Sequence, residues 1–82
     1  MDVKVLGPGC ARCKTLYEET AKALEQLGLA ANLTKVEMMD EIVKYRVLMT
    51  PGLVIDGEVK CAGRIPSQAE ITGWLTTAAT KE

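Results

Sequence analysis

Two cysteines three positions apart carry the most reactive side chains of this sequence. Cys10 and Cys13 form a C-x-x-C pair, and Cys61 is the third cysteine among the 82 residues. The chain contains no histidine, which excludes cysteine–histidine catalysis and metal sites with imidazole ligands. An odd number of cysteines is also unlike a secreted domain that disulfides hold together. The pair therefore indicates either thiol–disulfide exchange or metal binding through thiolates.

Cys10 lies where a turn meets the start of a helix, which the pattern predicts from about residue 11 to residue 27. Gly7-Pro8-Gly9 ends the preceding strand, so Cys10 falls among the unpaired N–H groups at the positive end of the helix dipole. Arg12 and Lys14 add positive charge within the same turn. Because these features favour a thiolate, which is the attacking species in disulfide exchange, we predict that Cys10 is the nucleophile.

Cys13 is placed to complete such a reaction. It follows Cys10 by about one helical turn and begins the apolar stripe of the helix, so we expect it to be the more buried sulfur. We therefore expect Cys13 to resolve a mixed disulfide formed at Cys10, which leaves a Cys10–Cys13 disulfide.

A carrier of Cu(I) or Zn(II) is the alternative, because small metallochaperones use two thiolates in a similar way. No second C-x-x-C completes a four-sulfur site, and Cys61 could supply only a third ligand. Our primary expectation is therefore redox chemistry with no metal and no cofactor. We expect Cys61 to be a packed core thiol, with a third redox site or a dimer-forming thiol as its alternatives.

The elements around the pair predict an α/β fold in the order β-α-β-α-β-β-α. Strands that alternate with helices favour parallel crossovers, and Asp56-Gly57 is a two-residue hairpin signal that adds an antiparallel strand. The expected architecture is a four-stranded mixed sheet with helices on both faces. Strands are predicted at residues 2–6, 31–38, 53–55 and 58–61, and helices at residues 11–27, 40–46 and 67–78.

Local signals mark the ends and faces of these elements. Gly28 is a fitting end for the first helix, and Asp40 is expected to cap a short helix in which Val43 packs inward. Ser67-Gln68-Ala69-Glu70 is a capping box that opens the last helix. Alternation in the fourth strand predicts that Val59 and Cys61 share its inward face.

Composition limits the partners that the chain is expected to have. It is 48% hydrophobic and 26% charged with a net charge of −1, so one ordinary domain spanning residues 1–82 is expected, and we expect a monomer. Since no basic patch or long apolar run stands out, we expect neither a nucleic-acid nor a membrane partner. The acidic Asp2 is unlike the start of a signal peptide, which favours a cytoplasmic protein.

Three stretches of the sequence, GPGCARCK from Gly7, TPGLVIDG from Thr50 and GRIPS from Gly63, resemble the small thioredoxin/glutaredoxin-like proteins. These are the redox-active disulfide proteins of archaea and bacteria, and the resemblance covers essentially the whole chain. It implies a minimal thioredoxin fold and a thiol–disulfide oxidoreductase that reduces disulfides in protein partners and is recharged by an upstream reductase or a low-molecular-weight thiol. It also implies that Pro51 is a cis-proline beside the active disulfide and that Thr50 offers backbone contacts to a substrate.

The sequence departs from larger thioredoxins in two ways. Gly9 stands where they carry tryptophan, and Ala11-Arg12 replaces the glycine–proline pair between the cysteines. Lys4 occupies the position at which they carry a buried acid that accepts a proton. The resemblance therefore leaves the group that takes the proton from Cys13 unidentified.

Overall fold

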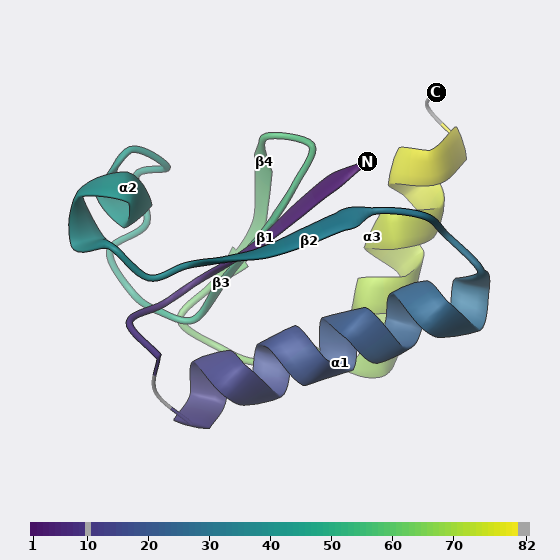
Figure 1. Cartoon of the computed structure of the whole chain (residues 1–82), viewed down its shortest axis with the longest axis horizontal. Helices are drawn as coiled ribbons and strands as arrows, with labels where there is room; N and C mark the ends of the chain where they lie inside the picture. The colour runs from purple at the N-terminus through teal and green to yellow at the C-terminus, as the bar shows by residue number, and fades with distance from the viewer. Residues whose placement is uncertain (10, 81–82) are drawn as a thin grey trace.

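A four-stranded mixed sheet organises the chain, as Figure 1 shows for the computed structural model, which describes residues 1–9 and 11–80. The strands lie in the order β2-β1-β3-β4, and the elements follow one another as the sequence predicts. The α/β class and the mixed sheet are therefore confirmed. The elements are β1 (Asp2–Leu6), α1 (Ala11–Leu27), β2 (Asn32–Val36), α2 (Met39–Val43), β3 (Gly52–Ile55), β4 (Glu58–Ala62) and α3 (Gln68–Thr80).

The direction of β3 differs from the expectation. β1 and β2 are parallel, but β3 runs antiparallel to β1 as well as to β4, so the prediction of three parallel strands is wrong. The link between β2 and β3 contains only the short helix α2, which has five residues. A parallel β3 would require this link to return along the length of the sheet, and the antiparallel pairing shows that it does not. β3 therefore starts at the end of the sheet where β2 finishes, and α2 lies at that same end (Figure 1).

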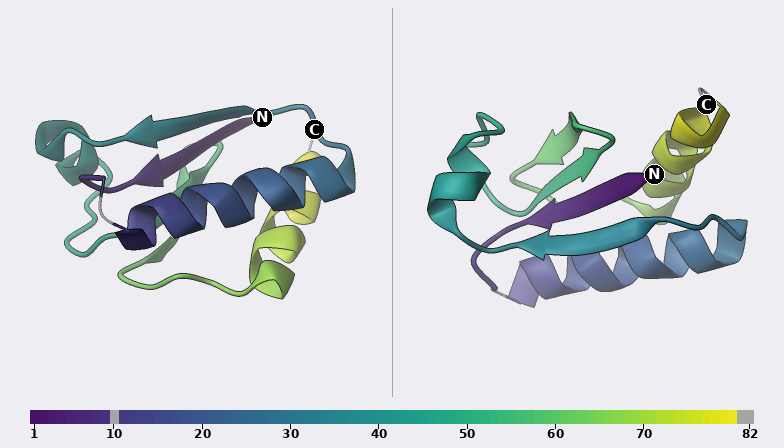
Figure 2. Two further views of the ribbon diagram at one scale, coloured as in Figure 1. Left: turned by 60° about the horizontal axis from the view of Figure 1, so that its bottom comes forward. Right: turned by 45° about the horizontal axis from the view of Figure 1, so that its top comes forward.

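Helices cover both faces of the sheet, which confirms the expected layers (Figure 2). The larger core lies between the sheet and the helices α1 and α3, which pack against each other. The smaller core lies on the opposite face beneath α2. The first cluster contains Val3, Val5, Leu16, Ala23, Leu24, Leu53, Ile55, Cys61, Ile71 and Leu75, and the second contains Leu6, Ile42, Val47 and Val54.

The first helix ends in a Schellman motif, as the glycine after it predicts. The N–H group of Gly28 donates to the carbonyl of Glu25 at 3.1 Å, and the N–H group of Leu29 donates to that of Leu24 at 3.0 Å. The buried stripe of α1, which has 17 residues, also confirms the predicted helix. Neither α1 nor any other helix in the described part of the chain is long and apolar enough to cross a bilayer.

Two expectations for the short helix are wrong. Met38 is at the N-cap position without a side-chain cap, and Asp40 lies within the first turn. The carbonyl of Met38 accepts hydrogen bonds from the following helical N–H groups, so the helix starts without the side chain of Asp40. Val43 is 55% exposed, because a helix of five residues turns only Ile42 fully into the smaller core.

A β-bulge changes the faces of the fourth strand. Leu53 pairs with Cys61 and Val54 pairs with Val59, so Lys60 is an extra residue between the two pairs. Residues that pair across an antiparallel ladder share a face. Cys61 therefore faces the larger core, whereas Val59 faces the opposite side and is 40% exposed. The prediction that both residues face inward is right for Cys61 and wrong for Val59.

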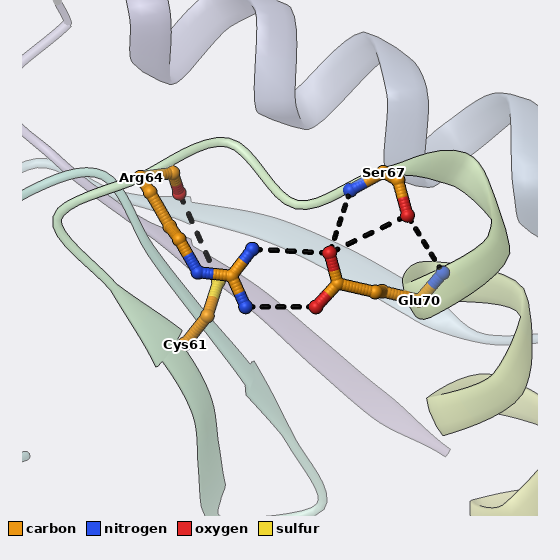
Figure 3. Close-up of polar contacts among 4 residues, drawn as sticks. All are labelled: Cys61, Arg64, Ser67 and Glu70. Carbon is orange, nitrogen blue, oxygen red and sulfur yellow. Dashed lines mark hydrogen bonds and ion pairs between the residues drawn. The ribbon is translucent and has the colours of Figure 1, made fainter.

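The last helix begins with the predicted capping box (Figure 3). The Ser67 hydroxyl accepts from the N–H group of Glu70 at 3.2 Å, and a Glu70 carboxylate oxygen accepts from the Ser67 N–H group at 3.2 Å. Arg64 donates two further bonds to this carboxylate, at 3.1 and 2.7 Å. These bonds, together with the Ser67 N–H group, hold the pKa of Glu70 at about 2.

Candidate active site

The candidate site lies at the end of β1, where the chain turns into α1. The predicted nucleophile Cys10 lies outside the described residues. Cys13 lies in the first turn of α1, which starts at Ala11, and only 5% of its surface is exposed. The expectation that Cys13 is a buried sulfur at the start of the helix is therefore confirmed.

Gly7 lets the sulfur of Cys13 approach the backbone at the end of β1. A Cβ atom on Gly7 would lie 2.0 Å from the Cys13 Sγ and 2.9 Å from its Cβ, which is far inside van der Waals contact. The same position is 3.8 Å from the Cβ of Thr50. Gly7 is thus the point at which the first turn of α1 and the loop before β3 come together.

The loop before β3 contains a cis peptide bond between Thr50 and Pro51, which the resemblance implied. Pro51 is buried, and its carbonyl accepts a hydrogen bond from the N–H group of Gly63 at 2.8 Å. The carbonyl of Gly63 in turn accepts from the Arg12 Nη2 at 3.1 Å. Arg12, which stands between the two cysteines in sequence, therefore links the start of α1 to the cis-proline loop.

A cavity of about 200 Å³ opens beside the sulfur of Cys13. It lies between α1 and the ends of β1 and β2, where the Gly7 N–H group donates to the carbonyl of Val36 at 2.9 Å. A Cβ atom on Gly9 would be 3.5 Å from the Glu37 Oε2, so this carboxylate lies against the turn. The residues that line the cavity are Val5, Gly7, Gly9, Cys13, Lys14, Lys35 and Glu37.

Lys4 lies on the other face of the sheet. It pairs with Val54, which belongs to the smaller core under α2, and its Nζ donates to the Tyr45 hydroxyl at 3.0 Å. This hydrogen bond raises the pKa of Lys4. Lys4, which stands at the position where a proton-accepting acid was sought, therefore bonds to Tyr45 and does not line the cavity of Cys13.

Cys61 is a packed core thiol, as expected. It is 8% exposed in the larger core, and its Sγ lies 3.8 Å from the carbonyl oxygen of Arg64 (Figure 3). Burial raises the pKa of this thiol, which keeps it protonated and unreactive at neutral pH. Within residues 1–9 and 11–80, no three cysteine, aspartate or glutamate side chains gather in a group that could hold a metal ion.

Sequence reasoning found most of the site but missed the second strand's contribution to it. Arg12 and Lys14 lie at the start of α1 as predicted, although Arg12 is directed to the cis-proline loop through Gly63 and Lys14 lines the cavity. Lys35 and Glu37 were not singled out. Parallel pairing of two predicted strands would have pointed to them, since the carboxyl ends of parallel strands meet at one edge of a sheet.

Together, the mixed sheet, the two helical layers and the cis-proline loop beside α1 define a minimal thioredoxin-like fold. The family described as thioredoxin domain matches residues 1–76. The thioredoxin of Methanothermobacter thermautotrophicus is 38% identical over 71 residues, which cover 87% of this chain and 92% of that protein. The thioredoxin of Methanocaldococcus jannaschii is 39% identical over 69 residues, which cover 84% and 79%. The chain belongs to the thioredoxin family, whose class of activity is thiol–disulfide oxidoreduction.

Proposed function

We propose that this protein reduces disulfide bonds in protein partners with the thiols of Cys10 and Cys13. The observation that carries the proposal is the placement of Cys13, buried at the start of α1 with its sulfur against Gly7 and close to the cis-proline loop. A sulfur held in this way is shielded from solvent and is suited to a second, intramolecular attack.

The proposed cycle has two exchange steps. The thiolate of Cys10 attacks one sulfur of the substrate disulfide, which forms a mixed disulfide and releases one substrate thiolate. The sulfur of Cys13 then attacks the sulfur of Cys10, which releases the second substrate thiolate and leaves the Cys10–Cys13 disulfide. The substrate gains two electrons and the protein dithiol loses them.

Cys10 immediately precedes α1, whose N-terminal N–H groups and dipole favour a negative charge at that position. Lys14 adds a positive charge in the first turn, and Gly9, at a φ of 88°, turns the chain before the helix. Arg12 acts mainly through its hydrogen bond to Gly63, which supports the loop that carries Thr50 and Pro51.

The loop before β3 is the proposed contact for the substrate. Thr50 is half-buried and borders the same point as Cys13, so backbone contacts made there would hold a substrate chain next to the dithiol. Leu48 and Met49 directly precede it and are 96% and 65% exposed. Such an apolar surface suits contacts with a protein rather than with a small polar disulfide.

An upstream reductase or a low-molecular-weight thiol would return the disulfide to the dithiol. Because a dithiol reductant works only where its disulfide is continually reduced, we propose that the cycle takes place in the cytoplasm.

Reduction of insulin under single-turnover conditions tests the assignment of the two cysteines. The Cys10→Ser variant is expected to lose activity, and the Cys13→Ser variant is expected to accumulate a mixed disulfide that intact-mass measurement detects. The Cys61→Ser variant is the matched control and should keep its activity, because Cys61 packs in the larger core and does not line the cavity beside Cys13. Retained activity in the Cys10→Ser variant would contradict the proposal.

A further inference from the structure

The second exchange step needs a proton acceptor that can reach a buried sulfur. Cys13 must lose its proton before it attacks, because the thiolate is the nucleophile. Its sulfur is almost entirely buried, so bulk solvent has little direct access to it. Lys4 lies on the opposite face of the sheet with Tyr45 and cannot serve.

A carboxylate next to the end of the second strand lines the cavity beside Cys13. Glu37 directly follows β2 and lines the same cavity as Cys13, and its Oε2 lies against Gly9. About 200 Å³ is enough for several water molecules, and the cavity has polar groups to bind them. A water chain can therefore connect the thiol with the carboxylate.

We propose that Glu37 accepts the proton of Cys13 through water in this cavity and so supports the attack on the mixed disulfide. The inference rests on the proposed roles of Cys10 and Cys13. Glu37 acts through water and touches neither the substrate nor the exchanging sulfurs. It is therefore a positioning residue, whose carboxylate sets where the proton of Cys13 goes.

In this second exchange step a proton passes from Cys13 to Glu37 while one disulfide replaces another. The proton leaves the Cys13 Sγ for a cavity water, and that water gives a proton to the Glu37 carboxylate. The Cys13 sulfur forms a bond with the Cys10 sulfur, and the bond between Cys10 and the substrate sulfur breaks. The substrate leaves as a thiolate and takes a proton from the solvent, while Glu37 returns its proton to the solvent.

The other charged groups around the cavity fit this role. Lys14 of α1 and Lys35 of β2 line it, and their positive charges offset the negative charge that passes between Cys13 and Glu37. The Lys35 Nζ lies 4.8 Å from the centroid of the Tyr17 ring on α1. Arg12 is directed to the Gly63 carbonyl, and Cys10 precedes the helix.

A stopped-flow reaction with an aromatic disulfide, 5,5′-dithiobis(2-nitrobenzoate), separates the two exchange steps. In a Cys61→Ser background, attack by Cys10 releases the first coloured thiolate, and attack by Cys13 releases the second. We compare the parent with Glu37→Gln between about pH 5.5 and pH 9.5, a range that spans the ordinary thiol pKa. Glu25→Gln is the matched control, because Glu25 lies near the far end of α1, about 18 Å along the helix from Cys13.

The expected result is a change in the pH profile of the second release. Without the carboxylate, its rate should fall about ten-fold per pH unit below the thiol pKa, as the thiolate fraction does. The parent and Glu25→Gln should fall less steeply, so that Glu37→Gln is slower by about ten-fold or more near pH 6. The rates should converge above the thiol pKa, and Glu37→Asp should recover part of the rate at low pH.

Three results would overturn the inference. The first is a pH profile of Glu37→Gln that matches that of the parent. The second is a rate of the second release that Glu37→Gln lowers by one constant factor at every pH, as a purely structural defect would. The third is a steeper profile in Lys35→Met without a steeper profile in Glu37→Gln. Absence of the second release in the parent itself would instead refute the proposed roles of the two cysteines, so the two failures are distinguishable.

Discussion

Replacing Gly7 by alanine tests how closely the end of β1 and the first turn of α1 are packed. The new methyl carbon would lie 2.0 Å from the Cys13 Sγ, whereas nonbonded heavy atoms normally stay about 3.5–4.0 Å apart. The sulfur must therefore retreat by about 1.5–2 Å. It cannot do so by rotation alone, because the methyl carbon would also lie 2.9 Å from the Cys13 Cβ, so the start of α1 has to move.

The cost of this movement falls in the range for overpacked cores, about 1–3 kcal/mol. Gly7 is not among the residues with positive φ, so alanine adds no backbone strain to the steric contact. For a domain of this size, each 1 kcal/mol lowers Tm by about 4–8 °C. We therefore expect the Tm of Gly7→Ala to fall by about 4–24 °C under reducing conditions.

Thermal and denaturant unfolding of the reduced protein measure this effect, with Gly73→Ala as the matched control. Gly73 lies within α3, and no atom is within 4 Å of the position of its added Cβ. Alanine there should raise the free energy of unfolding by up to about 1 kcal/mol, since glycine is a poor helix former. The same chemical change should thus have opposite signs at the two positions.

An unchanged or raised Tm for Gly7→Ala would refute the close approach of Cys13 to the backbone. The second thiolate release in the stopped-flow assay gives an independent check, because a displaced Cys13 should resolve the mixed disulfide more slowly. Gly73→Ala should leave that rate unchanged.

Three further predictions concern the region from Cys61 to Glu70. Ser67→Ala removes the oxygen that accepts from the Glu70 N–H group, and the free energy of unfolding in urea should fall by about 1 kcal/mol; no change would show that the cap is dispensable. The pKa of Glu70 is about 2, below its usual 4.5, so its ionised form adds stability that is present above about pH 4.5 and is lost as the pH falls toward 2. The difference in Tm between the parent and Glu70→Gln should therefore shrink across that window, whereas a constant difference would contradict the sign. In a variant with the other two cysteines replaced by serine, Cys61 should react with iodoacetamide at least about ten-fold faster in denaturant than in the folded protein. The reason is that burial raises the pKa of this thiol, and equal rates would refute its place in the core.

Sequence reasoning succeeded where neighbouring residues carry all the information. The turn at Asp56-Gly57, with φ values of 48° and 84°, is the hairpin that this dipeptide predicts. The capping box between Ser67 and Glu70 forms both of its reciprocal hydrogen bonds. Each of these features is decided within four residues of sequence, so no knowledge of the fold is needed to predict it.

The errors concern features that distant parts of the chain decide. The direction of β3 follows from where the segment between β2 and β3 ends on the sheet, and the short helix in it, predicted at 40–46 and observed at Met39–Val43, does not indicate that direction. The bulge at Lys60 arises because Leu53 and Val54 are consecutive in β3, whereas their partners Cys61 and Val59 are two positions apart in β4. Neither result can be obtained from the alternation of a single strand, because each depends on its partner.

The face of the sheet on which Glu37 lies depends on the register of the parallel strands β1 and β2. Val5 pairs with Lys35 and Leu6 pairs with Val36, so Lys35 and Glu37 face α1 while Val36 faces α2. A slip by one residue would turn Glu37 away from Cys13 and bring Val36 to the cavity. That slip would also remove Val36 from the smaller core, where it packs with Leu6, and would expose it to a polar cavity. The burial of Val36 on the α2 face, together with that of Leu33 against the larger core, therefore keeps the register in which the carboxylate lines the cavity of the thiol.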